Sequence, residues 1–170
     1  MNKKVYEESY KWGQTFDKEL CEMLDNKEYA LKVLGIEREN VKPRKDIAKW
    51  SDVKYIISYM YPEKFANNTK FEYQKITDVD EINKIVKTYF EKYYDESDDK
   101  NTWFNKMKDL AEELGYSREV KEYKANPEAY KGHVGDISTV IRVKLTGRCN
   151  TPDLYEIMQV LGKEEILKRI

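Results

Sequence analysis

The sequence predicts an all-α protein, and three observations support that fold class. Apolar residues recur at intervals of three or four along most of the 170 residues, and no run alternates polar and apolar residues for long enough to form a sheet. The chain has only 7 Gly and 4 Pro, whereas a β-sandwich needs many turn formers. Hydrophobic residues make up 40% of the chain and aromatic residues 13%, so a chain of this length can bury a real core.

Residues 1–65 are predicted to form a first subdomain of helices joined by polar turns. A turn is expected at 25–26, and Gly35 is followed by a polar joint at 37–43. A stripe over 47–60 predicts one further amphipathic helix, which Pro62 should end. The apolar positions with helical spacing before the joint are Tyr6, Tyr10, Leu20, Met23, Leu24, Ala30, Val33 and Leu34.

Residues 66–170 are predicted to form a second helical subdomain, in series with the first. Thr77 as N-cap, with Asp80 three residues later, resembles a capping box and predicts the start of a helix. The acidic run at 95–99 predicts a solvated loop after that helix. The apolar positions of this part are Val79, Ile82, Val86, Tyr89, Phe90, Tyr93, Phe104, Met107, Leu110, Ala111, Leu114, Ile137, Val140, Ile141 and Leu145.

Three glycines and a proline mark the ends of the later helices. Gly115 and Gly147 follow apolar stripes in the position where glycine commonly ends a helix. Thr151 and Pro152 predict a new helix, with Thr151 as the N-cap and Pro152 at the first helical position. Gly162 should stop that helix, and one short helix follows it.

Charge is distributed unevenly along a chain whose net charge is −1. Residues 42–54 contain five basic and two acidic residues, and residues 131–170 contain seven basic and five acidic residues. Residues 63–99 contain ten acidic and six basic residues. A uniformly basic protein would coat any polyanion, but a chain with this balance can bind one only locally.

The sequence carries few of the patterns that catalysis or metal binding requires. Cys21 and Cys149 are far apart and His133 is the only histidine, so we expect no zinc site and no Ser–His or Cys–His nucleophile. A glycine-rich phosphate loop is lacking, and the 95–99 run does not have the ligand spacing of a calcium loop. With no long apolar run and no signal-peptide pattern, we expect a cytoplasmic chain that binds neither membrane nor DNA.

The joint at 147–150 is the first candidate for a binding site. A helix that begins at Thr151 would direct its unpaired backbone N–H groups toward the joint and attract negative charge there. Arg142 can reach the same place, and its guanidinium suits a planar acceptor such as a base edge or a phosphate. Pro152 and Leu154 could supply an apolar shelf for a base splayed out of an RNA loop.

A purely structural role is the alternative for this joint. Thr151 would then only cap a helix, while Arg142 would pair with a nearby acidic residue such as Asp136 or Glu156. Caps and ion pairs are commoner than binding sites, so the residues alone leave both interpretations open.

The basic stretch 42–54 is the second candidate. Arg44, Lys45 and Lys49 lie next to Trp50, and a basic patch beside an aromatic residue suits contact with phosphates. The alternative is that Trp50 continues the apolar stripe into the core and that the lysines are solvated.

The tail GDISTVIRVKLTGRCNTPDLYEIMQVLGKEEILKRI, residues 135–170, closely resembles the C-terminal end of bacterial glutamyl-tRNA synthetase. The segments KEYALKVLGIERE and IERENVKPRKDIAKWSDVKYIISYMY are similar to the clostridial-type branch of that family, so the resemblance covers most of the chain. It implies a class I aminoacyl-tRNA synthetase, an ATP-dependent glutamate–tRNA ligase of protein biosynthesis. Such an enzyme has an N-terminal Rossmann-type catalytic domain and a C-terminal helical cage that reads the anticodon.

The resemblance also implies what this chain lacks. No HIGH-like or KMSKS-like motif is present, so we expect a C-terminal fragment without the Rossmann domain and without catalytic activity of its own. No cofactor is expected in this chain, since ATP and Mg²⁺ would bind the absent catalytic domain. The implied partners are tRNA, with tRNA-Glu first, and the protein's own catalytic domain. A stand-alone helical module that binds tRNA or a protein without aminoacylation is the alternative.

Site residues are carried over from the resemblance position by position. Arg142 matches the arginine that touches the anticodon, Thr151, Pro152 and Leu154 match the positions that line the base pocket, and Thr139 matches a polar position. Arg44 is the nearest candidate for an arginine that separates Glu from Gln anticodons, and recognition of tRNA-Gln stays open. The residues predicted to bind the anticodon are Arg142, Thr151, Pro152, Leu154, Thr139 and Arg148, with tRNA backbone contact at Arg44, Lys45 and Lys49.

Overall fold

The computed structural model describes residues 2–170, and the regular secondary structure of that range is helical apart from one isolated bridge between Ser117 and His133. The prediction of an all-α fold is confirmed. The chain divides into two compact units. Unit 1 comprises Met1–Asn68 and Pro152–Leu161, and unit 2 comprises Thr69–Thr151 and Gly162–Ile170. The domain division between residues 65 and 66 stays a prediction. It did not anticipate that Pro152–Leu161 belongs to unit 1.

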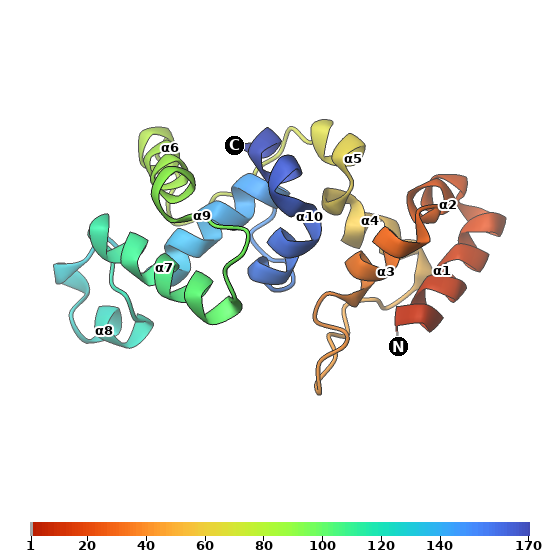
Figure 1. Cartoon of the computed structure of the whole chain (residues 1–170), viewed down its shortest axis with the longest axis horizontal. Helices are drawn as coiled ribbons and strands as arrows, with labels where there is room; N and C mark the ends of the chain where they lie inside the picture. The colour runs from red at the N-terminus through yellow and green to blue at the C-terminus, as the bar shows by residue number, and fades with distance from the viewer. Residues whose placement is uncertain (1) are drawn as a thin grey trace. The chain divides into compact units, whose positions relative to one another are not determined.

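Unit 1 is built mainly from three helices that pack on one another near the start of the chain (Figure 1). They are α1 (Asn2–Phe16), α2 (Lys18–Leu24) and α3 (Lys27–Gly35). Asp17 caps α2 by accepting the Leu20 N–H at 3.2 Å, and Asn26 caps α3 by accepting the Tyr29 N–H at 3.1 Å. Both side chains satisfy a backbone donor that the helix itself leaves unpaired. The turn predicted at 25–26 is therefore confirmed.

The stripe at 47–60 does not form the single helix predicted from its periodicity. It contains η1 (Trp50–Asp52), α4 (Val53–Ile57) and η2 (Ser58–Met60), of which η1 and η2 are 3-10 turns. The Ser58 hydroxyl donates to the Tyr55 carbonyl at 3.0 Å, a local bond that competes with regular helix geometry. Pro62 starts α5 (Pro62–Ala66) instead of only ending a helix, because a proline fits the first helical position.

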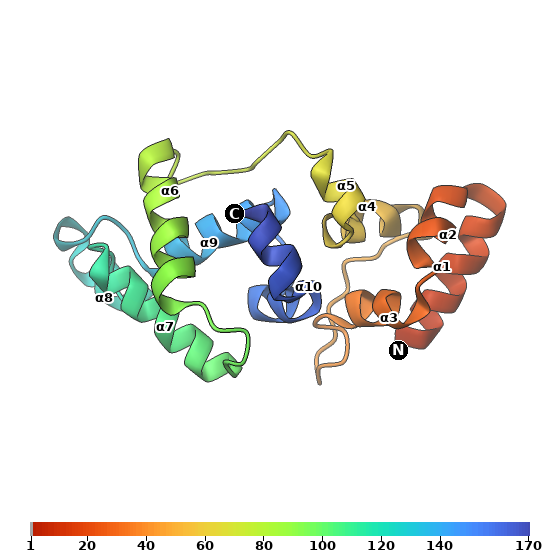
Figure 2. The same ribbon diagram turned by 45° about the horizontal axis from the view of Figure 1, so that its top comes forward.

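Unit 2 is centred on α9 (Val134–Thr146), which packs against both α6 (Val79–Thr88) and α7 (Lys100–Glu113) (Figure 2). A π-helical turn, η3 (Tyr89–Tyr93), continues α6. The shorter elements α8 (Val120–Ala125) and η4 (Pro127–Ala129) connect α7 to α9. Fully buried side chains from these helices form the core of the unit, and they are Ile85, Tyr89, Met107, Leu110, Ile137, Ile141 and Leu145.

Two predictions in unit 2 were wrong by one residue. Asp78, not Thr77, caps α6, since its carboxylate accepts the Glu81 N–H at 2.8 Å. Trp103 is buried with 8% exposure, whereas Phe104 is 42% exposed. The predicted helix end after α7 is confirmed, because Gly115 has φ +84°, a value that residues with a Cβ rarely adopt.

The helix α10 (Leu154–Arg169) is interrupted at Gly162, whose φ of 76° and ψ of 159° are not helical. This confirms Gly162 as a helix stop. The residues before it belong to unit 1 and those after it to unit 2.

Candidate nucleic-acid interface

The joint after α9 is shaped by a glycine in the left-handed conformation. Gly147 has φ 77°, and its N–H donates to the Val143 carbonyl at 2.7 Å. This is the usual way in which a helix ends while one of its last carbonyls still finds a donor. The joint predicted at 147–150 therefore has the form that the sequence indicated.

Arg142 and Thr151 meet across this joint within unit 2. The Arg142 guanidinium donates to the Thr151 carbonyl at 3.3 Å and to the Thr151 hydroxyl. Thr151 is only 8% exposed, so the arginine is held by a group that is itself fixed. The carboxylates considered as partners for Arg142 have other contacts: Asp136 pairs with Lys75, and Glu156 accepts the Glu37 N–H at 2.8 Å.

The prediction that Thr151 caps the next helix was wrong. Asp153 is the cap, since its carboxylate accepts the Glu156 N–H at 3.0 Å and α10 begins at Leu154. The Thr151 hydroxyl is engaged by Arg142, and aspartate caps a helix at least as well as threonine. Pro152 consequently precedes the helix instead of occupying its first position. The N–H groups of this helix therefore begin beyond the joint.

Pro152 and Leu154 belong to unit 1, and both are buried, with Leu154 2% exposed. Burial is compatible with packing as well as with a shelf for a base, so their predicted role in binding stays a prediction.

An extended segment of unit 2, residues 69–78, runs along the joint; we call it the strap. The Glu72 N–H donates to the Gly147 carbonyl at 3.0 Å, and the Glu72 carboxylate accepts the Cys149 N–H at 3.1 Å. The Gln74 amide N–H donates to the Cys149 sulfur at 3.1 Å. These bonds fix the backbone of the joint, which connects α9, the helix that carries Arg142, to Thr151.

The acidic and thiol groups of this contact influence each other. The Cys149 N–H, as the largest effect, lowers the pKa of the Glu72 carboxyl, and the positive charges of Lys70 and Arg148 add to that. Burial, followed by the hydrogen bond and charge of Glu72, raises the pKa of the Cys149 thiol. Glu72 is therefore ionised and Cys149 protonated near neutral pH, which gives this cysteine a packing role instead of a nucleophilic one. Arg148 lies in the joint, where its N–H donates to the Thr146 hydroxyl at 3.1 Å, and its predicted contact with the anticodon stays a prediction.

The other end of the strap is tied to the first turn of α9. Lys75 forms an ion pair with Asp136 at 3.2 Å, and Asp136 also accepts the His133 N–H at 3.0 Å. His133 in turn accepts the Gly135 N–H at 3.0 Å, which completes a capping box. Sequence reasoning gave His133 no role, because histidine is not among the residues that commonly cap helices. Thr139 lies one turn further along and donates to the Gly135 carbonyl at 2.8 Å.

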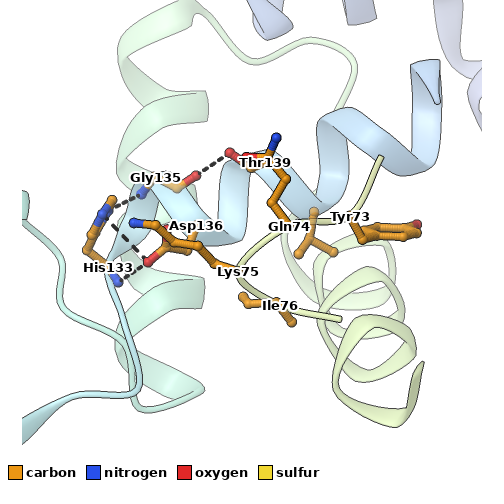
Figure 3. A pocket seen from close by; sticks show the side chains of 9 residues that line it. Tyr73, Gln74, Lys75, Ile76, His133, Gly135, Asp136 and Thr139 are labelled. Atoms are coloured by element: carbon orange, nitrogen blue, oxygen red, sulfur yellow. Dashed lines mark hydrogen bonds and ion pairs between the residues drawn. The ribbon is translucent and has the colours of Figure 1, made fainter. Parts of the chain in front are cut away.

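A cavity of about 250 Å³ lies between the strap and α9 (Figure 3). Thr139 is the one predicted site residue that lines it. Sequence reasoning missed the others, because the strap has no helical period and its partners on α9 are distant in the sequence. The lining residues are Tyr73, Gln74, Lys75, Ile76, His133, Gly135, Asp136, Thr139 and Val140.

The basic stretch of unit 1 is partly neutralised by its own neighbours. Arg44 bonds Asp46 at 3.0 Å and Glu37 at 3.3 Å, and the buried Arg38 bonds Asp46 at 2.6 Å. Burial raises the pKa of the Asp46 carboxyl, but the hydrogen bonds and charges of Arg38 and Arg44 outweigh it and hold the pKa below its ordinary value.

The two predicted lysines of that stretch differ from Arg44 in being exposed. Lys45 is exposed, and Lys49 forms a loose ion pair of 3.9 Å with Asp52. Trp50, predicted to lie in the core, is only half-buried. Contact of Arg44, Lys45 and Lys49 with a tRNA backbone stays a prediction.

Within residues 2–170, no three or more His, Cys, Asp or Glu side chains are grouped so that they could hold a metal ion. None of the helices in that range has the length and apolar character that crossing a membrane requires.

The chain is similar to several glutamate–tRNA ligases. It is 43% identical over 169 residues to that of Clostridium perfringens, 42% identical over 167 residues to that of Acetivibrio thermocellus, and 35% identical over 167 residues to that of Sorangium cellulosum. Each comparison covers 98% of this chain but only 31%, 30% and 29% of the respective relative. The chain thus spans less than a third of the length of these relatives. No solved structure gives a significant match.

A family model described as an anticodon binding domain matches residues 10–170. The match includes α9, the strap, the joint and all of α10. Because it extends over nearly the whole sequence, this chain belongs to the anticodon binding domain family and is homologous to part of the glutamate–tRNA ligases.

Proposed function

We propose that this chain binds the anticodon loop of a tRNA and reads bases there with Arg142. The observation that carries the proposal is the position of Arg142, whose guanidinium is fixed by Thr151 at the joint of an anticodon-binding domain. Sequence-specific RNA recognition usually targets unpaired loop bases, whose edges are accessible to such a group.

The chemistry of the corner supports base recognition by Arg142. A guanidinium presents five N–H donors in a planar fork, which matches the acceptor pair on a base edge or a phosphate. Thr151 restricts the orientation of that fork before any RNA arrives, so less side-chain entropy is lost on binding. The strap and Gly147 hold the backbone beneath it.

The names of the relatives support tRNA-Glu as the tRNA. We further propose that the chain acts together with a catalytic domain that joins glutamate to tRNA, in the cytoplasm. ATP and Mg²⁺ would bind that domain, and this chain would contribute affinity and anticodon specificity without a cofactor. Its own aminoacylation activity should be nil.

Binding of this chain to a tRNA-Glu transcript, followed by fluorescence anisotropy, tests the proposal. With a net charge of −1 the chain can neutralise few phosphates, so raising the salt from about 50 to about 200 mM should weaken binding only about 10- to 100-fold. The absence of binding at the lower salt concentration would refute the proposal and favour a module that binds a protein partner.

A further inference from the structure

We infer that the cavity between the strap and α9 binds one unpaired nucleobase of the RNA, stacked against the aromatic side chains of the strap. This inference rests on the proposed function and adds a second base-binding position to the one at Arg142. It assigns a role to Tyr73, Phe71 and Gln74, which the sequence did not single out.

The size of the cavity fits a single planar ring. Its volume of about 250 Å³ is below the roughly 300–1,000 Å³ of pockets that hold drug-sized ligands. A nucleobase would enter with its attached ribose outside.

The strap supplies an aromatic surface. Phe71 and Tyr73 are two residues apart on an extended chain, so their side chains leave on the same side. Their rings lie nearly parallel, with centroids 6.4 Å apart and an interplanar angle of 14°. Phe71 is 40% exposed, and Tyr73 lines the cavity (Figure 3). Bases stack on such rings whatever their sequence, because every base has a π-face.

The remaining walls offer both an apolar floor and polar edges. Ile76 and Val140 line the cavity with aliphatic carbon. The Thr139 hydroxyl donates its proton to the Gly135 carbonyl, which leaves its oxygen as an acceptor. The Gln74 amide is anchored through its nitrogen on Cys149 and has a carbonyl oxygen as a further acceptor. This mixture of flat apolar surface and hydrogen-bonding edge matches the chemistry of a base.

The charge around the cavity favours RNA over an apolar ligand. Lys75 is 69% exposed at the cavity while its ammonium group is held by Asp136. Lys70 belongs to the strap and Arg148 to the joint, and both positive charges lower the pKa of the Glu72 carboxyl. A phosphate linked to the bound base would therefore meet positive groups on the strap and at the joint.

The cavity and the Arg142 corner belong to one continuous surface. Thr139 and Arg142 are separated by three residues on α9, a spacing that places side chains on the same helix face. The strap contacts the joint through Glu72 and the start of α9 through Lys75. Neighbouring bases of one splayed loop can therefore reach Arg142 and the cavity together.

The test uses an RNA hairpin with the anticodon stem and loop of tRNA-Glu, carrying the fluorescent base 2-aminopurine at one loop position at a time. At one position the unmodified chain should change the fluorescence. Tyr73→Leu should abolish that change and weaken binding roughly 5- to 150-fold, as expected for the loss of base–aromatic stacking. Tyr73→Phe, which keeps the ring, should bind like the unmodified chain.

Two further variants make the outcome decisive. Tyr130→Leu is the matched control, because Tyr130 is also in unit 2, is 36% exposed and does not line the cavity. Thr139→Val keeps the cavity's shape and removes one polar edge, so it should weaken binding about 3- to 10-fold. This variant tests the inference independently if Tyr73→Leu does not fold.

Failure of this inference can be told apart from failure of the proposed function. If the unmodified chain binds the hairpin but Thr139→Val and folded Tyr73 variants stay within about twofold of Tyr130→Leu, the cavity does not hold a base. If the unmodified chain binds neither the hairpin nor the full tRNA-Glu transcript, both are overturned.

Discussion

The buried Arg169, near the end of the chain, should contribute strongly to the stability of unit 2, and its replacement by methionine tests this. The Arg169 side chain is 1% exposed, and its Nε donates to the Glu165 carboxylate, itself 16% exposed, at 2.8 Å. Its Nη1 donates to the Leu145 carbonyl at 2.7 Å, in the last turn of α9. Arg169→Met keeps the apolar stem and removes both bonds.

The expected loss of folding free energy follows from the groups that Arg169→Met leaves without this partner. The Leu145 carbonyl is among those that a helix cannot pair internally, and Glu165 becomes a largely buried carboxylate without this partner. Removing one partner of a buried ion pair costs about 3–5 kcal/mol. For a chain of this length that corresponds to a melting temperature lower by about 6–20 °C.

Urea denaturation followed by circular dichroism measures this loss. Lys168→Met is the control, because its pair with Glu164 is 65% and 88% exposed and should contribute at most about 0.5 kcal/mol. The double variant Arg169→Met with Glu165→Met should recover stability to within about 1–2 kcal/mol of the unmodified chain, since no buried charge is left alone. A loss under about 1 kcal/mol for Arg169→Met, or a double variant no better than the single one, would refute the reasoning.

Two further predictions concern Gly147 at the joint and the loss of folding stability at low pH. Gly147→Ala should cost about 1–2 kcal/mol, because φ of 77° is strained for alanine; an unchanged urea midpoint would contradict this. The hydrogen bonds from Lys64 and Lys54 lower the pKa of Glu19 from 4.5 to about 2. A depressed carboxyl pKa stabilises the fold above 4.5 and loses this effect as pH falls toward about 2. Glu19→Gln should therefore be less stable than the unmodified chain at neutral pH only, and a gap that persists at pH about 2 would contradict it.

The sequence predicted those features that local chemistry determines. Gly115 and Gly147 mark helix ends because a single residue supplies the left-handed conformation at each of them. The acidic run at 95–99 is outside the helices, but it is not simply solvated: Asp98 is 10% exposed and pairs with Lys106, and Asp99 caps α7.

Features that depend on distant contacts could not be predicted in this way. Thr151 and Asp153 are both good N-caps, and the contact between Thr151 and Arg142 decides which of them serves. The strap has no periodicity of its own and is fixed by partners such as Cys149, 77 residues from Glu72. The cavity between the strap and α9, and hence the role of Tyr73, could not be predicted because its walls come from segments distant in the sequence.

Dependence of binding on the anticodon tests the central claim most directly. The affinity of this chain would be measured for a tRNA-Glu transcript and for one with altered anticodon bases, with the unmodified chain and with Arg142→Ala. The account predicts that the altered anticodon weakens binding to the unmodified chain by about 1–3 kcal/mol, and that Arg142→Ala removes most of this difference. Equal affinity of the unmodified chain for the two transcripts would contradict it, because contacts made only to phosphates cannot tell the transcripts apart.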